Sequence, residues 1–294
     1  MPPSTLSSYV QLGMATHPIA STPIRPLSRR PYNTSEEPTA IAPMPRHTIR
    51  LVHEAFPDRP AFDTAVSRAL LQRASEGLEP ATLRLYRPAA IVAFGPQDVS
   101  APGFRAAVHA AQAQGFAGVR RLAGGRAAVF HEATLAFSWT IPDADPIPGT
   151  HRRFRELAEI MLAALISLGI DARIGGVAGE YCPGEYSVNA GGRTKLMGVG
   201  QRMVSRAAHV GGVVVAGDSY RIRDVLLPVN QALGLAWDPD TVGSVEDEVG
   251  TTDCHAIEAA IVAAFAEHFT LVPGTLSNET LILADTLTGQ HTAT

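Results

Sequence analysis

From residue 47 onward, apolar positions recur along the chain with two different periods. A period of two is typical of strands with one buried face, and recurrence every three or four residues is typical of amphipathic helices. The pattern predicts strands at 47–53, 82–87, 90–94, 119–122, 128–131, 135–141, 171–174 and 209–216. It predicts helices at 62–74, 104–114, 152–168 and 220–233, and a final helix that is capped at residue 252 or 253 and ends at 268.

Two further strands, 185–189 and 194–197, flank a turn at residues 190–192 and are expected to form a hairpin. Hairpins mixed with irregularly spaced helices indicate a mixed sheet, because a doubly wound parallel sheet needs regular alternation of strands and helices. The sequence therefore predicts an α+β fold with a mixed, largely antiparallel sheet flanked by helices. This domain is expected to span residues 47–283.

The two ends of the chain lack such a pattern. Residues 1–46 hold nine of the 22 prolines and many Ser and Thr residues, a composition that predicts a disordered extension. Arg25, Arg29 and Arg30 suggest a transit peptide, two adjacent glutamates speak against one, and translation starting at Met44 is an equal alternative. Residues 284–294 are expected to be a polar tail.

Composition narrows the classes of function. A net charge of −4 and a pI near 6.2 argue against nucleic acid as the main partner, which would need clustered positive charge. No run reaches the roughly 18 to 20 apolar residues of a membrane span. Cys182 and Cys254 form neither a disulfide framework nor a CxxC metal pair, so we expect no metal site and a reducing cytoplasm. The default expectation for the oligomeric state is a monomer.

The chain contains a single lysine, Lys195, beside 23 arginines. A GC-rich genome explains the excess of arginine, and chance retention of one lysine is an alternative. Arginine is a planar fork with permanent charge, whereas lysine is a compact point charge. A lysine that persists in this background indicates a position where arginine would not serve.

The first segment with candidate chemistry is RRLAGGRAAVFH, residues 120–131. Gly124 and Gly125 let the backbone approach a ligand closely, and Arg121 and Arg126 can donate to a phosphate or carboxylate. The alternative is a glycine turn in a hairpin with solvated arginines. The segment is neither a P-loop nor a dinucleotide fingerprint.

The second segment is CPGEYSVNAGGRTKLMGVGQR, residues 182–202. Cys182 lies in a Gly/Pro-rich loop thirteen residues before Lys195, and the predicted hairpin folds Lys195 back toward that loop. A cysteine beside a cation is a candidate nucleophile. The alternative is a small packed residue. Cys254 is interpreted as structural.

Together these segments resemble the lipoate-protein ligase and octanoyltransferase group, whose fold is shared with biotin protein ligases. RRLAGGRAAVFH is similar to the motif RR-x-(S/T)-GG-(G/R)-AV-x-H, in the GGR form typical of cysteine-dependent octanoyltransferases, and KLMGVGQR is similar to K-(L/I/V)-x-G-(S/V)-(A/G)-Q. The resemblance extends from about residue 50 to 250. The sequence departs from the pattern in three ways. It has one extra alanine in Gly-Arg-Ala-Ala-Val, it has Ala123 in place of Ser or Thr, and Pro-Gly follows Cys182.

The resemblance implies an acyltransferase of lipoate metabolism that moves an octanoyl or lipoyl group through a Cys182 thioester, with Lys195 holding the acyl carbonyl. It implies an acyl chain in an apolar tunnel beside the Gly-Gly turn. It implies acyl carrier protein as donor and lipoyl-domain acceptors, namely the glycine cleavage H protein and the E2 chains of 2-oxoacid dehydrogenases. The substrate-binding residues would be Arg121, Gly124, Gly125, Arg126, His131, Gly198, Gly200 and His209, although a packed strand residue is the favoured interpretation of His131.

Two alternatives stay open. An ATP-dependent lipoate-protein ligase would need ATP and Mg²⁺ and would not need Cys182, whereas the transferase needs no cofactor. About 60 residues follow the last matching strand and helix, too few for the full accessory domain that ligases often carry, and this favours the transferase. The other alternative is a non-catalytic relative that binds acyl groups or lipoyl domains.

Overall fold

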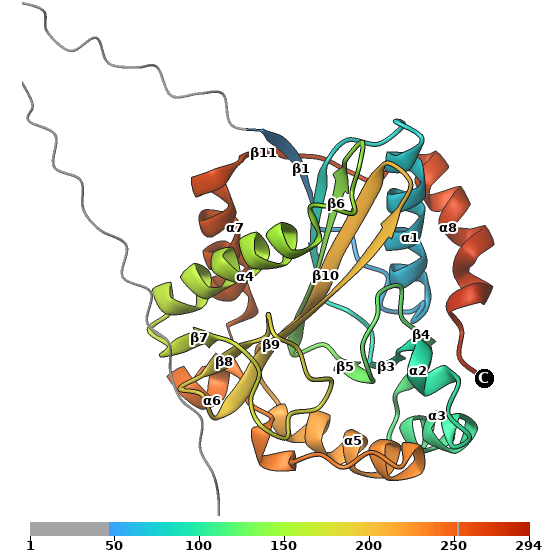
Figure 1. Ribbon diagram of the computed structural model, residues 1–294, viewed down its shortest axis with the longest axis vertical. Coiled ribbons are helices and arrows are strands. Elements are labelled where there is room, and N and C mark those ends of the chain that lie inside the picture. Colours follow the sequence, from blue (N-terminus) through green and yellow to red (C-terminus); the bar gives the residue numbers. More distant parts are fainter. Residues whose placement is uncertain (1–46, 252) are drawn as a thin grey trace, which may run out of the picture. The chain divides into compact units, whose positions relative to one another are not determined.

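The computed structural model describes residues 47–294 apart from residue 252. An eight-stranded sheet forms the centre of this part of the chain (Figure 1), with the strand order β11-β1-β2-β6-β10-β9-β8-β7. Strand β1 is parallel to β11 and β2, and the other neighbouring pairs are antiparallel. The strands are β1 Thr48–Val52, β2 Thr82–Tyr86, β6 Thr134–Pro142, β7 Ala172–Ile174, β8 Val188–Ala190, β9 Thr194–Val204, β10 Ala207–Val215 and β11 Thr270–Pro273.

Helices cover both faces of this sheet, which confirms the predicted mixed sheet flanked by helices. Helix α4 (Thr150–Ser167) packs against α7 (Cys254–His268) on one face, and α1 (Phe62–Ser75) packs against α8 (Asn278–His291) on the other (Figure 1). The alternation in β6 explains the two-sided burial. The residues at positions 135, 137, 139 and 141 face the α4–α7 core, and Trp139 lies edge-on to Phe265 at 5.6 Å.

A second, three-stranded sheet holds the Gly-Gly segment. Its order is β4 (Ala117–Arg120), β3 (Ile91–Phe94) and β5 (Ala128–Phe130), with β4 parallel and β5 antiparallel to β3. The hairpin interpretation of this segment is therefore wrong, because β3 lies between the two strands. Residues 121–127 instead cross the end of β3, where a Cβ on Gly95 would lie 1.6 Å from the Gly125 carbonyl oxygen.

The remaining helices lie beside the small sheet and the end of the large one. Helices α3 (Phe104–Ala113) and α5 (Ser219–Leu233) pack on each other, and their apolar side chains form a separate core with β3 and β5. Helix α5 follows the strand predicted at 209–216, as expected. Three short elements complete this region: α2 Pro96–Val99, α6 Val245–Val249 and the 3-10 helix Pro239–Thr241.

The C-terminal segment differs from the prediction. The helix ending at His268 is not the last, because β11 and then α8 follow, and α8 includes most of the expected polar tail. Its buried positions are Thr280, Ala284, Leu287 and His291. Their spacing is helical, but two of the four are polar and find partners, with the Thr280 hydroxyl donating to Glu79. A face that is half polar gives a weak hydrophobic signal.

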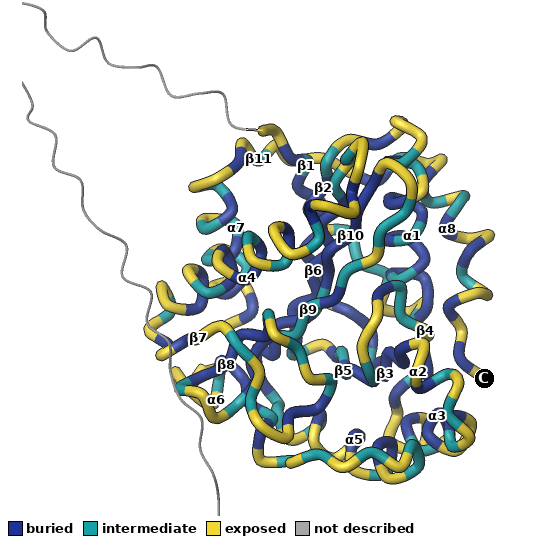
Figure 2. The backbone as a smooth tube through the Cα atoms, in the orientation of Figure 1, coloured by how far each residue is buried: buried dark blue, intermediate teal, exposed yellow. Residues whose placement is uncertain are grey.

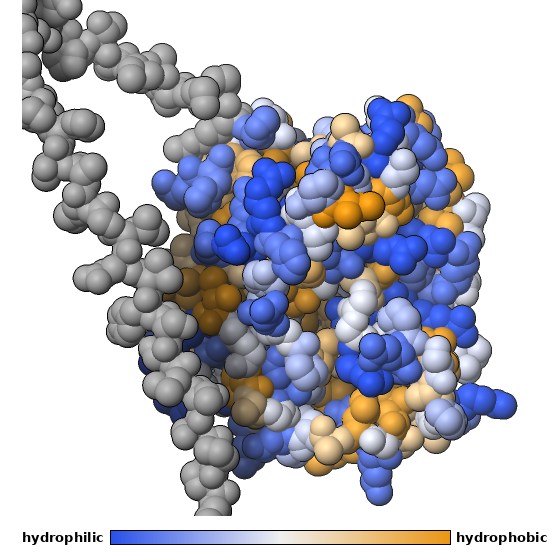
Figure 3. All heavy atoms as spheres, in the orientation of Figure 1, coloured by the Kyte–Doolittle hydropathy of each residue, from blue (hydrophilic) through white to orange (hydrophobic). Residues whose placement is uncertain are grey.

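Burial concentrates in the strands and on the inner sides of the helices, while helix exteriors and turns are exposed (Figure 2). Hydrophilic and hydrophobic side chains are interspersed on the face shown in Figure 3. None of the helices between residues 47 and 294 is long and apolar enough to cross a membrane. The predicted disorder of residues 1–46 concerns a segment outside the described residues.

Candidate active site

The loop between β7 and β8 is organised around one buried carboxylate, that of Glu180. The Glu180 side chain is inaccessible to solvent and accepts hydrogen bonds from the backbone N–H of Val177 at 3.0 Å and of Gly184 at 2.9 Å. It also accepts from the Ser187 hydroxyl at 3.2 Å. A carboxylate so enclosed needs a cation close by, since an unpaired buried charge is costly.

Lys195 on β9 supplies that cation. Its ammonium lies 3.2 Å from Glu180 Oε1 and donates to the carbonyl oxygens of Tyr181 at 3.1 Å and Cys182 at 2.7 Å. The predicted approach of Lys195 to the cysteine loop is confirmed. An ammonium has three donors, and all three are engaged by the loop. Lys195 thus fixes the backbone on which the cysteine sits.

Cys182 has a φ of 45°, in the left-handed region that a residue with a side chain rarely adopts. Such strain persists only where the surroundings enforce it, and it often marks functional sites. The Sγ atom accepts from the backbone N–H of Arg126 at 3.3 Å and from Arg121 Nη1 at 3.4 Å. Both donors stabilise negative charge on the sulfur.

The Gly-Gly turn reaches the thiol because it has no side chains. Gly125 has a φ of 108°, and a Cβ there would lie 3.0 Å from Cys182 Sγ and 2.9 Å from Arg121 Nη1. On β9, a Cβ on Gly200 would lie 2.9 Å from Arg121 Nη2. These glycines let the turn, the Arg121 guanidinium and the thiol approach one another.

A cavity of about 350 Å³ opens beside the thiol, within the usual size range of small-molecule sites. Cys182, Lys195 and Arg121 are among its polar lining residues, with His151, Glu185 and Gln201, and Gly124, Gly125, Gly198 and Gly200 also line it. Its apolar lining includes Phe130, Phe154, Tyr186, Val199 and Val213. The Cys182 sulfur therefore lies at the edge of a cavity with apolar walls, an arrangement that suits the binding of an acyl group.

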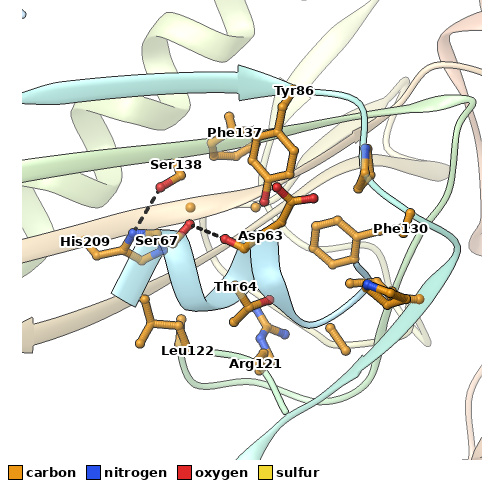
Figure 4. A pocket seen from close by; sticks show the side chains of 18 residues that line it. Asp63, Thr64, Ser67, Tyr86, Arg121, Leu122, Phe130, Phe137, Ser138 and His209 are labelled. Atoms are coloured by element: carbon orange, nitrogen blue, oxygen red, sulfur yellow. Dashed lines mark hydrogen bonds between the residues drawn. The ribbon is translucent and has the colours of Figure 1, made fainter. Parts of the chain in front are cut away.

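A second cavity of about 60 Å³ lies on the other side of Arg121, and both polar and apolar side chains line it (Figure 4). Asp63, Tyr86 and His209 line it, and His209 Nδ1 lies 3.4 Å from the Ser138 hydroxyl. Asp63 pairs with the fully buried Arg84. His209 is thus separated from the thiol cavity, although both cavities share Arg121.

Two other candidates occupy different places. The Arg126 guanidinium turns to Asp98 Oδ1 at 3.2 Å, so only its backbone N–H reaches the thiol. His131 is completely buried and accepts from the Ala133 N–H through Nδ1 at 3.2 Å, and it lines neither cavity. Cys254 is buried in the large core, where burial raises the pKa of its thiol.

The buried histidines His131 and His209 are expected to make the folded chain less stable in acid. Burial, followed by the charge of Arg121, lowers the pKa of His209 to about 4, and burial, followed by the charge of Arg221, lowers the pKa of His131 to about 4. Unfolded histidine titrates near pH 6.5. Between these values the unfolded chain binds protons that the folded chain does not, so the free energy of unfolding falls as pH falls.

The expected slope is about 1.4 kcal/mol per pH unit for each histidine across that window. Urea unfolding at several pH values between 7.5 and 4.5 measures it. The His209→Asn variant should lose one histidine's share of the slope. An unchanged slope in that variant would show that His209 is not the titrating group.

Sequence patterns missed three residues of the site. Glu180 precedes the cysteine by two positions, but an isolated acidic residue in a loop carries no signal of burial. Phe154 and Tyr186 stack at 5.1 Å with nearly parallel rings at the cavity edge, and they come from α4 and the loop. The described residues contain no group of three or more His, Cys, Asp or Glu side chains that could hold a metal ion.

Comparisons with known proteins place this geometry in a family. Residues 59–266 match the lipoyl protein ligase A/B catalytic domain. The chain is 29% identical over 160 residues to octanoyl-GcvH:protein N-octanoyltransferase of Geobacillus kaustophilus, covering 53% of this chain and 54% of that protein. It is 29% identical over 275 residues to octanoyltransferase LipM of Kyrpidia tusciae, covering 84% and 97%. The chain spans about half the length of the first of these relatives.

Solved structures show the same fold. A bipartite lipoate protein ligase from Thermoplasma acidophilum superposes with a TM-score of 0.66 at 22% identity, covering 83% of this chain and 93% of that one. LipL1 of P. falciparum, in complex with lipoate, superposes with a TM-score of 0.57 at 12% identity, covering 82% and 72%. With more than half of its residues matched by the family model, the chain belongs to the lipoyl protein ligase A/B catalytic domain family.

Proposed function

We propose that this chain transfers an octanoyl group, through a thioester on Cys182, to the acceptor lysine of a lipoyl-domain protein. The observation that carries the proposal is the position of the thiol. Its sulfur lies in a strained turn, receives two N–H donors and opens onto a cavity with apolar walls. Relatives named as octanoyltransferases support the reaction class.

The chemistry consists of two acyl transfers. The Cys182 sulfur attacks the carbonyl carbon of an octanoyl thioester on acyl carrier protein, a new C–S bond forms, and the carrier thiolate leaves. The neutral amine of the acceptor lysine then attacks the Cys182 thioester, an amide forms, and the Cys182 thiolate leaves while the amine proton passes to solvent. A covalent intermediate divides the transfer into two accessible steps.

Arg121 and the Arg126 N–H would stabilise the sulfur anion that enters the first step and leaves in the second. Lys195 would act first as a positioning residue, because its three donors hold Glu180 and the carbonyls of the cysteine loop. Direct contact between Lys195 and an acyl carbonyl would require it to exchange one of these bonds. The acyl chain would lie along Phe130 and Val213.

The proposed reaction needs no cofactor, and it suits a reducing cytoplasm that keeps the thiol free. The acceptors would be the glycine cleavage H protein or E2 lipoyl domains, and the active species would be a monomer. The ligase alternative would instead use ATP and Mg²⁺ to make an acyl-adenylate.

Intact-protein mass spectrometry tests the proposal in two incubations without acceptor, one with octanoyl-acyl carrier protein and one with octanoate and MgATP. We expect a hydroxylamine-sensitive octanoyl adduct on Cys182 from the carrier protein. Acyl-adenylate formation with no adduct would make the chain a ligase. No product in either incubation would favour the non-catalytic relative.

A further inference from the structure

A groove of about 330 Å³ is lined by residues of α1, of the ends of β4 and β9, and of α8. Four arginines line it: Arg68, Arg120, Arg121 and Arg202. Its other lining residues are Leu71, Gln72, Ser75, Pro96, Leu122, Val204, Gln290 and His291, so no carboxylate faces it. We call this site the arginine groove.

Among the described residues, the arginines of the groove have no carboxylate partner to neutralise them. Arg50, Arg84 and Arg153 each pair with a carboxylate. Within residues 47–294, apart from 252, neither Arg68, Arg120 nor Arg202 forms an ion pair. Like charges gathered in one groove of an acidic protein raise its free energy and attract an anionic partner.

The C-terminal helix α8 forms one wall of the groove and is anchored there by a buried histidine. His291 is 3% exposed, and its Nδ1–H donates to the Arg120 carbonyl at 2.7 Å, which fixes the end of β4. Its Nε2 is buried without a partner among the described residues. Helix α8 therefore holds one wall of the groove in place.

The groove adjoins the reacting sulfur. Arg121 lines both the arginine groove and the thiol cavity, and its Nη1 lies 3.4 Å from Cys182 Sγ. An acceptor lysine spans only about 6 Å from Cα to Nζ at ordinary bond lengths. The backbone around an acceptor lysine must therefore come down beside the sulfur. A carrier protein delivers its acyl group on a long flexible arm and has no such constraint.

We infer that the arginine groove docks an acidic surface that flanks the target lysine of the acceptor protein. This inference rests on the proposed octanoyl transfer. Acidic side chains beside the lysine would pair with Arg68, Arg120 and Arg202, orient the acceptor and direct the amine to the Cys182 thioester. The groove would thus select acceptors by charge around the lysine, while the thiol cavity selects the acyl group.

The test measures binding of unmodified glycine cleavage H protein to the full chain by calorimetry, in a Cys182→Ser background that blocks turnover. The double variant Arg68→Glu/Arg202→Glu is expected to weaken binding at least about tenfold and to flatten its salt dependence. Arg105→Glu on α3 is the control, since Arg105 is exposed and lines none of these cavities; it should change binding less than twofold.

A kinetic arm uses chains with Cys182 intact and a neutral donor, the octanoyl thioester of N-acetylcysteamine. The double variant should form octanoyl-Cys182 at the wild-type rate. Unchanged acceptor binding, or weakened binding of octanoyl-acyl carrier protein with acceptor binding intact, would overturn the inference. Absence of octanoyl-Cys182 in the wild-type chain would refute the proposed function, whereas the binding measurement would still decide the role of the groove.

Discussion

The Cys182→Ala variant is expected to lose octanoyl transfer by at least about a thousandfold and to form no octanoyl adduct. The reason is specific to the sulfur, since within residues 47–294, apart from 252, no other thiol approaches the cavity and Cys254 is in the core. Steady-state transfer from octanoyl-acyl carrier protein to the acceptor, followed by gel or mass analysis, measures the effect.

The chain offers its own control. Cys254→Ala removes a buried thiol of the large core, so it should lower stability by about 1 kcal/mol through lost packing and leave transfer within twofold. Circular dichroism should show that Cys182→Ala is folded, because alanine is smaller than cysteine and introduces no new contact at this position. Transfer that survives in Cys182→Ala would eliminate the thioester route.

The local pattern of apolar and polar residues was sufficient to predict most strands of the large sheet. From Thr134 to Ile141, strand β6 alternates between small side chains and large apolar ones, so its period alone indicates one face toward a core. The approach of Lys195 to the cysteine was equally accessible, because a Gly-Gly turn fixes how β9 returns beside β8. Both inferences depend on neighbours close in sequence.

Long-range pairings were not accessible in the same way. Strands β4 and β5 flank a short glycine segment and have the pattern of a hairpin, yet β3, from more than twenty residues upstream, lies between them. The hydrophobic pattern failed to predict helix α8 for a different reason. Its buried Thr280 and His291 form hydrogen bonds with Glu79 and the Arg120 carbonyl, partners far away in the sequence.

The site shows the same division. The residue types of the two motifs pointed to a thiol, a cation and a close backbone approach, and the structure brings Cys182, Lys195, Arg121 and the glycines around one cavity. The burial of Glu180 could not be predicted, because it depends on how residues 177–187 wrap around the carboxylate. The location of His209 in the second cavity, on the other side of Arg121 from the thiol, likewise depends on which face of β10 meets α1.

The buried pair of Lys195 and Glu180 leads to the second large effect. Lys195→Met is expected to lower the free energy of unfolding by about 3 kcal/mol, because it leaves the Glu180 carboxylate without its cation and two carbonyls without a donor. It should also slow formation of octanoyl-Cys182 at least about a hundredfold, since small displacements of a nucleophile are costly. Urea unfolding and single-turnover acylation measure the two effects.

The double variant Lys195→Met/Glu180→Gln separates charge from position. Glutamine is neutral and can keep hydrogen bonds to the loop, so the double variant should regain at least about 1 kcal/mol of stability over Lys195→Met. If Lys195 acts only by positioning the loop, acylation should recover in parallel with stability. If stability recovers and acylation does not, the ammonium contacts the acyl carbonyl during the reaction, and one of its three loop bonds must open for it to do so. Equal stability of the single and double variants would show instead that the buried charges are not coupled.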